Sequence, residues 1–202
     1  MIRDLASLPE DATYDLVVVG AGAAGMAAAL FAAIAGKKAL LVERTEYLGG
    51  TTALSAATTW VPNSRHAKKV SQDDSPEKAA RFLDGVVGNY GRREMRQVFL
   101  ESGPKAIDTL EDHSEVQFRP YATHPDYEQE AEGATLRGRA LEPLPFDGRT
   151  LGKALDLIRP PIPEFTIFGG MMVDRTDIGH LLKLKENVAS FRHALGILGR
   201  YG

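Results

Sequence analysis

The chain of 202 residues contains no cysteine, which excludes disulfides, thiolate metal sites and cysteine redox chemistry. An excess of one charge is also missing, because the formal net charge is −3 with 25% charged residues. This balance gives no electrostatic footprint for nucleic acid or for an acidic membrane surface. The hydrophobic content of 44% is ordinary for a soluble globular protein.

Long hydrophobic runs are missing as well. Residues 1–11 carry acidic side chains early and have no apolar core, which argues against a signal peptide. The Ala-rich segment 23–35 is too short to span a bilayer. We therefore expect a cytoplasmic protein with no membrane span and no nucleic-acid partner. His180 and His193 are expected on helix surfaces without metal-ligand spacing, so we predict no metal site.

The most informative stretch runs from Tyr14 to Glu43. Its order of strand, glycine turn, helix, strand and acid is formed by Leu16–Val19, Gly20–Gly25, Ala23–Ala35, Ala39–Val42 and Glu43. The first apolar run does not alternate, which is typical of a strand covered on both faces in a parallel sheet. Gly36 is expected to end the helix.

Each glycine of the turn has a physical role. Gly20 allows the tight turn, Gly22 allows a pyrophosphate close to the backbone, and Gly25 allows close helix–strand packing. The helix that begins there directs unpaired N–H groups at the phosphates. Glu43 can accept hydrogen bonds from ribose hydroxyls and would repel a 2′-phosphate, although Arg44 beside it weakens that repulsion. The pattern predicts dinucleotide binding, against an alternative in which the glycines only allow close packing.

A small, hydroxyl-rich loop follows the acid. It contains Gly49, Gly50, Thr51, Thr52 and Ser55. Such a loop can hydrogen-bond a second, larger part of a ligand through backbone N–H groups and hydroxyls. A plain connecting loop with a glycine turn fits these residues equally well, so the residues alone leave both interpretations open.

About the first 60 residues resemble the N-terminal FAD-binding segment of the fumarate reductase/succinate dehydrogenase flavoprotein superfamily. Within them, Gly49–Ser55 and Trp60–Pro62 resemble the 3-ketosteroid Δ1-dehydrogenase branch, although Ala56 and Ala57 stand where those enzymes usually have glycines. The resemblance implies that the ADP half of FAD is held by Gly20, Gly22, Ala24, Gly25, Glu43 and Arg44. It places Gly49, Gly50, Thr51, Thr52 and Ser55 beside the riboflavin half. In the members of that superfamily that attach FAD covalently, a histidine lies in this loop. Since this chain has none between Glu43 and Arg65, the resemblance implies noncovalent FAD.

A proline-bearing loop in residues 116–133 gathers Arg119, Tyr121, His124 and Tyr127. A phenol can donate a hydrogen bond to a carbonyl or support proton transfer. Composition alone favours a surface loop whose tyrosines cover apolar residues. The resembling ketosteroid dehydrogenases place one active-site tyrosine in a similar aromatic-Pro-Asp-Tyr stretch, which makes Tyr121 and Tyr127 the catalytic candidates.

Several other features carry weaker expectations. Arg137 and Arg139 could bind an anion, but a solvated charged turn is favoured, and His66 is expected to be solvated in a surface linker. Helices are expected from a Ser75-Pro76 start, over 92–102, after a break at 103–104, over 151–158, over 174–184 and from 188 onward. The stretch 165–173 is apolar and is expected in the core.

The predicted fold class is α/β. An FAD/NAD(P)-binding Rossmann-type βαβ unit with an incomplete sheet covers residues 1–62, and a mainly helical start of a cap or substrate domain covers 63–202. Only two strong strands are found, whereas a doubly wound domain needs several. The resembling enzymes are longer, so we expect the N-terminal portion of such an enzyme, either truncated or the product of a split gene.

The predicted function is FAD-dependent dehydrogenation of a carbon–carbon bond next to a carbonyl, with a small apolar ketone such as a steroid as substrate. A rival within enzymes is a fumarate reductase-like reductase of an unsaturated acid, which would need arginines around the carboxylates. From another class, the chain could be a catalytically silent flavin-binding fragment that needs a C-terminal partner chain.

Overall fold

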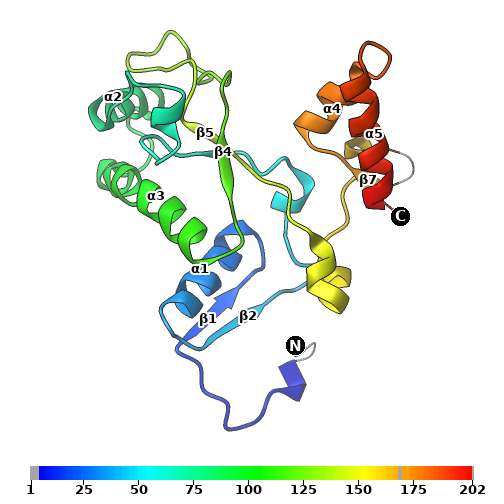
Figure 1. The fold of residues 1–202 in the computed structure, drawn as a ribbon. Coiled ribbons are helices and arrows are strands. Elements are labelled where there is room, and N and C mark those ends of the chain that lie inside the picture. Colours follow the sequence, from blue (N-terminus) through cyan, green and yellow to red (C-terminus); the bar gives the residue numbers. More distant parts are fainter. Residues whose placement is uncertain (1–4, 168–169, 202) are drawn as a thin grey trace. The chain divides into compact units, whose positions relative to one another are not determined.

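The structure is a computed structural model that describes residues 5–167 and 170–201, with the side chains of residues 200 and 201 excepted. A strand–helix–strand unit begins the chain, and pairs of helices and pairs of short strands follow it (Figure 1). The chain divides into two compact units: one holds the residues up to 56 and from 148 onward, and the other holds residues 57–147. The expected domains, 1–62 and 63–202, stay a prediction, because compactness alone does not define a folding domain.

The first unit begins with the expected strand–helix–strand arrangement. Strand β1 (Leu16–Val19) pairs in parallel with β2 (Ala39–Val42), in register from Leu16 opposite Ala39 to Val19 opposite Val42. Helix α1 (Ala23–Ile34) makes the crossover between them (Figure 1). Gly36 follows the helix at φ +71°, a left-handed conformation that confirms the predicted C-terminal stop. The prediction of a mixed α/β chain with a parallel βαβ unit is confirmed.

The apolar side chains of this unit remain open to solvent. Val17 and Val19 of β1 are 56% and 84% exposed, and α1 contains no buried residue. The expectation that β1 is covered on both faces is therefore wrong for the described residues. The reason is geometric, since one neighbouring strand and one helix cover only part of a strand's surroundings. The βαβ unit has more apolar surface than its own elements bury.

The remainder of the first unit consists of short elements followed by a helix pair. The 3₁₀ elements are Leu5–Ser7, Thr52–Leu54, Gly148–Leu157 with a kink at Gly152, and Pro163–Phe165. A short hairpin is formed by β6 (Thr166–Ile167) and β7 (Met171–Met172). The helix pair is α4 (Arg175–Leu182) and α5 (Val188–Tyr201). Asp174 and Asp177 form a capping box that fixes the predicted start of α4. Of the apolar stretch 165–173, residues 168 and 169 lie outside the described residues.

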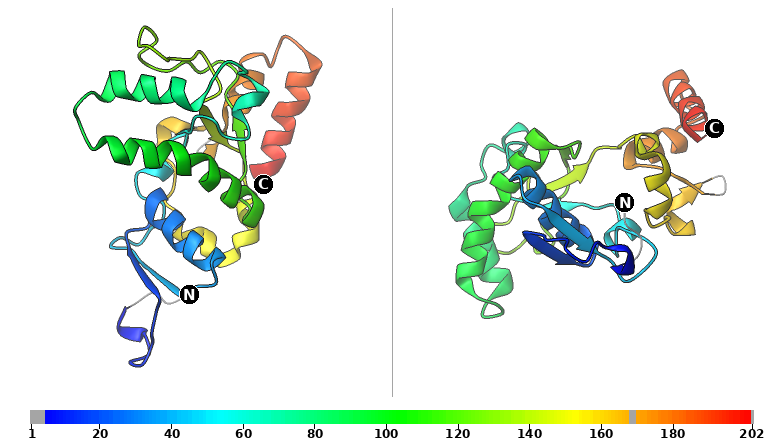
Figure 2. Two further views of the ribbon diagram at one scale, coloured as in Figure 1. Left: turned by 90° about the vertical axis from the view of Figure 1, so that its left-hand side faces the viewer. Right: turned by 90° about the horizontal axis from the view of Figure 1, so that it is seen from below.

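The second unit combines a small sheet with two long helices. Its antiparallel sheet has the order β3–β5–β4, formed by Thr59–Trp60, Ala140–Pro143 and Phe118–Pro120. A 3₁₀ turn at Ala67–Lys69 precedes helices α2 (Pro76–Val87) and α3 (Arg93–His113), which lie side by side in Figure 2. Val61, Ile107 and Leu141 form the buried core, with Phe118 packed against them.

The two helices of this unit agree with the predicted helix start at Ser75-Pro76 but not with the predicted break at residues 103–104. Ser75 accepts a hydrogen bond from the Lys78 backbone N–H at 3.1 Å, and Pro76 occupies the first turn, so the predicted start of α2 is confirmed. The predicted break at residues 103–104 is wrong, because α3 runs through Pro104. A Cβ on Gly103 would lie 3.2 Å from Val61 Cγ1, so the absent side chain allows the uninterrupted helix to pass close to the core.

Candidate functional site

The glycine turn after β1 is built by backbone geometry rather than by side chains. Gly20 has φ +99°, which an L side chain rarely adopts. A Cβ on Gly25 would lie 1.8 Å from the carbonyl oxygen of Gly20, so only glycine fits where α1 crosses the end of β1. Gly22 is the N-cap of α1 and supplies no side-chain hydrogen bond. The first N–H groups of α1 are therefore available to an anion.

The second glycine-bearing loop lies against this turn. The Gly49 backbone N–H donates to the Ala21 carbonyl oxygen at 2.8 Å. A Cβ on Gly50 would lie 3.0 Å from Gly22 Cα, and Gly50 itself has φ +54°. The structure thus brings the predicted residues Gly22 and Gly50 together through close backbone approach. A phosphate-containing ligand can accept hydrogen bonds from unpaired backbone amides of such loops.

Glu43, at the end of β2, reaches back to the same turn. Its carboxylate accepts hydrogen bonds from the Ala21 N–H at 2.8 Å and from the Thr45 N–H at 2.9 Å. The Thr45 hydroxyl donates a further bond at 3.1 Å. These backbone and hydroxyl donors, Ala21 first, lower the pKa of Glu43 from 4.5 to about 2. The acid therefore remains an ionised acceptor beside the glycine turn.

The other predicted cofactor residues fall on the same loops. Ala24 lies in the first turn of α1, and Arg44 is exposed next to Glu43. Thr52 begins a short 3₁₀ turn, and the Ser55 hydroxyl donates to its carbonyl oxygen at 2.8 Å. Thr51 is exposed just before that turn. The loop is therefore a folded turn with exposed Thr51 and Ser55 side chains, and its contact with a ligand stays a prediction.

The second unit contains a cavity of about 550 Å³, within the usual range of small-molecule sites. Its lining is largely apolar; the lining residues are Thr58, Trp60, Phe82, Leu83, Val86, His124, Pro125, Asp126, Tyr127, Glu128 and Ala140. The Tyr127 ring lies 6.1 Å from that of His124, and the Tyr121 ring lies 4.9 Å from it on centroids. Tyr127 is 90% exposed. The described lining includes Tyr127 but not Tyr121.

Asp126 anchors the loop that carries these aromatic residues. Its carboxylate accepts hydrogen bonds from the Trp60 indole N–H at 2.7 Å, from the Thr135 N–H at 2.9 Å and from Arg139 Nη1 at 2.9 Å. The Asp126 N–H also donates to the Thr135 carbonyl oxygen at 2.9 Å. Asp126 and Arg139 are 5% and 1% exposed. The loop is therefore pinned at the residue directly before Tyr127.

Arg139 does not lie in a solvated charged turn, so that prediction is wrong for this residue. Its Nε and Nη2 atoms donate to the two carboxylate oxygens of Asp74 at 2.9 and 2.6 Å, and Nη2 also donates to the Gly133 carbonyl oxygen. Its guanidinium lies 5.6 Å from the Trp60 ring centroid. An isolated anion has no place at a group already held by buried carboxylates. Arg137 is exposed, as expected.

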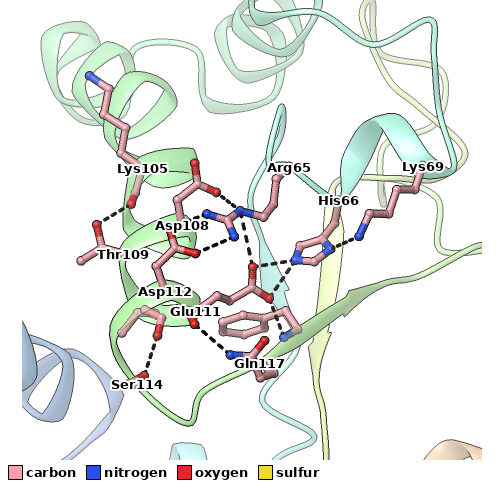
Figure 3. Close-up of polar contacts among 12 residues, drawn as sticks. Arg65, His66, Lys69, Lys105, Asp108, Thr109, Glu111, Asp112, Ser114 and Gln117 are labelled. Carbon is pink, nitrogen blue, oxygen red and sulfur yellow. Dashed lines mark hydrogen bonds and ion pairs between the residues drawn. The ribbon is translucent and has the colours of Figure 1, made fainter.

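His66 is also not solvated, contrary to its prediction. It is 7% exposed, and its Nε2 lies 2.8 Å from both carboxylate oxygens of Glu111 on α3 (Figure 3). Lys69 Nζ lies 3.3 Å from His66 Nδ1. Because Lys can only donate, this contact makes Nδ1 the acceptor and Nε2 the donor to Glu111. Arg65 beside it bonds both carboxylate oxygens of Asp112, at 2.8 and 2.9 Å, and so ties the same segment to α3 (Figure 3).

His180 and His193 face each other between α4 and α5 instead of pointing outward from separate helix surfaces, so their prediction is corrected. Their rings stack with centroids 4.2 Å apart. His193 Nε2 lies 2.7 Å from an Asp177 carboxylate oxygen, and His180 Nδ1 lies 3.1 Å from the Ser190 hydroxyl. Over residues 5–167 and 170–201, no cluster of three or more His, Asp or Glu side chains is arranged to hold a metal ion. None of the described helices is long and apolar enough to cross a membrane.

Sequence reasoning missed the roles of Asp126, Arg139 and Trp60. Their partners lie far along the chain: Trp60 is 66 residues from Asp126, and Arg139 is 65 residues from Asp74. No periodicity or spacing relates such positions. The one local signal for an anchored loop is the short motif Pro125-Asp126-Tyr127, in which a charged residue directly precedes an aromatic residue in a proline-bearing loop.

Comparisons with known proteins agree with this geometry. Residues 15–175 match a protein-family model described as "FAD binding domain". The 3-oxosteroid 1-dehydrogenase of Mycolicibacterium smegmatis is 35% identical over 185 residues, which are 92% of this chain and 31% of that protein. The 4-oxocyclohex-2-ene-1-carboxylate 5-dehydrogenase of Sinomonas cyclohexanicum is 37% identical over 177 residues, 88% of this chain and 30% of that protein.

A solved structure is similar over nearly the same range. It is the crystal structure of 3-ketosteroid Δ1-dehydrogenase from Sterolibacterium denitrificans in complex with 1,4-androstadiene-3,17-dione. Its similarity has a TM-score of 0.81 at 30% sequence identity, covering 93% of this chain and 33% of that one. The chain spans about a third of the length of these relatives.

Proposed function

Because the chain belongs to the FAD-binding domain family matched over residues 15–175, we propose that it is the flavin-binding, N-terminal portion of a 3-ketosteroid Δ1-dehydrogenase-like oxidoreductase. The resemblance noted in the sequence is confirmed at the level of the family and of the 3-oxosteroid dehydrogenase relatives. The proposed reaction removes hydrogen from a carbon–carbon bond next to a carbonyl.

The observation that carries the proposal is the fit of the glycine turn to a pyrophosphate. The contact between Gly25 and the Gly20 carbonyl leaves no room for any other residue, and Gly22 opens α1 without a side-chain cap. Bare amides and the positive end of the α1 dipole then meet at one point. We assign the ADP half of FAD to this turn and to Glu43, with Ala24 and Arg44 flanking it. Gly49, Gly50, Thr51, Thr52 and Ser55 are assigned to the riboflavin half.

Noncovalent attachment is part of this proposal. Once bound, the flavin supplies the hydride acceptor for the reaction. The chain's own residues hold and orient it. The amides of α1 donate hydrogen bonds to the phosphates, and Glu43, kept ionised by Ala21 and Thr45, accepts hydrogen bonds from ribose hydroxyls. Glu43 also repels a 2′-phosphate, which favours FAD over a phosphorylated nicotinamide cofactor.

For the catalytic tyrosine we favour Tyr127 over Tyr121. Tyr127 lines the cavity with its phenol exposed, whereas the described lining does not include Tyr121. A phenol that donates a hydrogen bond to the substrate carbonyl makes the adjacent C–H bond more acidic. Asp126, bonded to Trp60, Thr135 and Arg139, fixes the backbone directly before that phenol.

The relatives' names cover two kinds of ketone. One is a 3-oxosteroid, which carries no charge, and the other is an oxocyclohexene ring that carries a carboxylate. Their identities to this chain, 35% and 37%, are too similar to choose between them. The cavity of about 550 Å³ accommodates a ligand of either size class. We propose a cyclic ketone as the substrate class.

We also propose that the exposed apolar surface of the βαβ unit is covered by further strands, from a continuation of the polypeptide or from a partner chain. Val17 and Val19 of β1 are more than half exposed, and a two-stranded sheet is marginally stable by itself. The chain alone is therefore expected to bind ligands without turning a ketone over. Turnover of a steroid by the isolated 202-residue chain would contradict this part of the proposal.

The first test is an absorbance spectrum of the purified chain before and after acid precipitation. Flavin bands that copurify and are released by acid would support noncovalent FAD binding. Flavin that stays with the precipitate would contradict the noncovalent assignment alone. A chain that remains colourless after incubation with FAD, although circular dichroism shows it folded, would overturn the flavin assignment.

A further inference from the structure

The cavity of the second unit has a one-sided charge. Among its described lining residues, Asp126 and Glu128 are acidic, and none is lysine or arginine. His124 is the one described lining residue with a basic side chain. Arg119, five residues before His124, is paired with Glu142 on β5 and does not line the cavity. An anionic ligand would thus find acids and no fixed positive charge in the described lining.

The buried charges beneath the cavity do not cancel. Arg139 is shared by two carboxylates: it gives Asp74 two hydrogen bonds, at 2.9 and 2.6 Å, and gives Asp126 one, at 2.9 Å. All three side chains are 1–2% exposed. One positive and two negative charges leave a net charge of −1. Asp74, which accepts two of the three hydrogen bonds that Arg139 donates to the carboxylates, also accepts a hydrogen bond from the Ser75 N–H at 3.0 Å.

Asp126 therefore carries the uncompensated charge, and it is the member of the trio that lines the cavity. Its other partners, the Trp60 indole N–H and the Thr135 N–H, are neutral donors. The Thr135 hydroxyl also lies 3.4 Å from the same carboxylate and carries no charge. Neutral donors stabilise the carboxylate without cancelling its field. A buried charge also acts over longer distances than an exposed one, because water and salt screen it less.

We propose that Asp126 is a specificity-determining residue that excludes carboxylate-bearing ketones from the cavity and so selects uncharged cyclic ketones. The inference rests on the proposed function, because it takes the cavity to be the ketone site. It follows the general rule that a site can reject one of two similar ligands by placing a like charge against it. The inference selects the uncharged ketone over the carboxylate-bearing ketone, a choice that the similar identities of the relatives leave open.

The chain contains its own probe for this test. Trp60 is the single tryptophan of the sequence, lines the cavity and donates to Asp126. Its fluorescence therefore reports ligands that enter this cavity. The ligands are 4-oxocyclohexanecarboxamide and 4-oxocyclohexanecarboxylate, which share a ring and differ in charge, together with a saturated 3-oxosteroid as the large neutral ketone. Titrations at pH 7.5 give a Kd for each.

We expect the carboxamide to bind at least about tenfold more tightly than the carboxylate. Glu128→Gln serves as the matched control, because Glu128 is an exposed acid of the same lining and its replacement leaves the buried trio intact. This variant is expected to keep the tenfold preference. In Asp126→Asn the preference is expected to fall to within about threefold, mainly through tighter binding of the carboxylate.

A second measurement does not depend on the folding of Asp126→Asn. Repeating the wild-type titrations at 1 M salt shortens the screening length to about 3 Å, which suppresses the effect of an exposed acid much more than that of a buried one. A preference for the carboxamide that survives high salt supports the role of Asp126. A preference that disappears at high salt or in Glu128→Gln overturns that role.

Equal Kd values for carboxamide and carboxylate overturn the specificity inference and leave the proposed function standing. If none of the three ketones changes Trp60 fluorescence, the cavity is not the ketone site, and the inference fails together with that part of the proposed function.

Discussion

The glycine turn of the first unit and the charged trio of the second are built in opposite ways. The turn consists of backbone, with the Gly25 position packed against the Gly20 carbonyl and its first amides unpaired. The trio consists of side chains, with Arg139 buried between Asp74 and Asp126. The amides of the turn are open to a ligand, whereas each side chain of the trio is hydrogen-bonded within the protein. The proposed cofactor site and the trio thus differ in which polar groups remain unpaired.

The same contrast holds for the apolar side chains of the two units. In the first unit Val19 is 84% exposed, whereas in the second Ile107 and Leu141 are 3% and 0% exposed around the core. The second unit therefore buries a hydrophobic core made of its own residues. The first unit holds a defined local geometry but leaves its hydrophobic surface uncovered. Substitutions that act on one unit and not on the other test this comparison.

The largest effect on stability is expected from Arg139→Met. This change leaves Asp74 and Asp126 buried without their cation, and breaking a buried pair in this way costs about 3–5 kcal/mol. Arg137→Met is the matched control, because Arg137 is exposed two residues away and its replacement should stay within about 0.5 kcal/mol. Urea unfolding followed by far-UV circular dichroism measures both. Equal midpoints for the two variants would show that the trio does not support the second unit.

The next largest effect is expected from Gly25→Ala. The new Cβ would lie 1.8 Å from the Gly20 carbonyl oxygen, so backbone must move, at a cost of about 1–3 kcal/mol. The flavin signal of the purified chain should be lost with the geometry of the turn. Gly85→Ala is the control, since Gly85 lies in α2 with no atom within 4 Å of its Cβ position, and it should gain about 0.5–1 kcal/mol. Full flavin retention in Gly25→Ala would separate cofactor binding from this turn.

The features that the sequence predicted correctly are local. The boundaries of β1, α1 and β2 follow from apolar runs and glycines within 30 residues of one another, and each cue acts on its own backbone. The Ser75-Pro76 start and the Asp174 cap follow from hydrogen bonds that reach only three residues along the chain. Backbone-defined sites can therefore be located from sequence.

The features that it missed depend on distant partners or on packing. His66 is buried because Glu111, 45 residues later, accepts from it, and no local pattern distinguishes it from a solvated histidine. Helix α3 continues through Pro104 because the packing of Gly103 near Val61 outweighs a local breaking signal. The cavity combines strand β3 and the loop 124–128 with α2, so its lining could not be assembled before the fold was known.

A smaller effect is expected from Pro104→Ala in α3. Proline lacks an N–H, so the alanine restores one helical hydrogen bond, worth about 0.5–1.5 kcal/mol, and the greater freedom of the unfolded chain offsets part of it. We expect a net gain of about 1 kcal/mol. Pro76→Ala is the control, because the first turn of α2 loses no hydrogen bond to proline and should gain nothing. Destabilisation by Pro104→Ala would mean that α3 requires the proline for its packing.

The smallest effect is expected from the acid dependence of the glycine turn. The pKa of Glu43 is lowered from 4.5 to about 2, chiefly by the Ala21 N–H. Above pH 4.5 the carboxylate is ionised in both the folded and the unfolded chain, and its stabilisation is fully present. Between pH 4.5 and 2 the unfolded chain binds the proton first, so stability falls as the pH falls. Glu43→Gln should make the free energy of unfolding depend less on pH below pH 4.5 and should leave its pH dependence unchanged above pH 5. Glu46 is an exposed neighbour, so Glu46→Gln should follow the wild type.

Solvent around the Glu43 carboxylate keeps the difference between the variants small, so the stabilities are compared through urea midpoints at pH 2.5 and 6. If the wild type and Glu43→Gln decline equally, the Ala21–Glu43 contact does not stabilise the turn, and Glu43 is available to a ribose without giving up a bond that stabilises the fold.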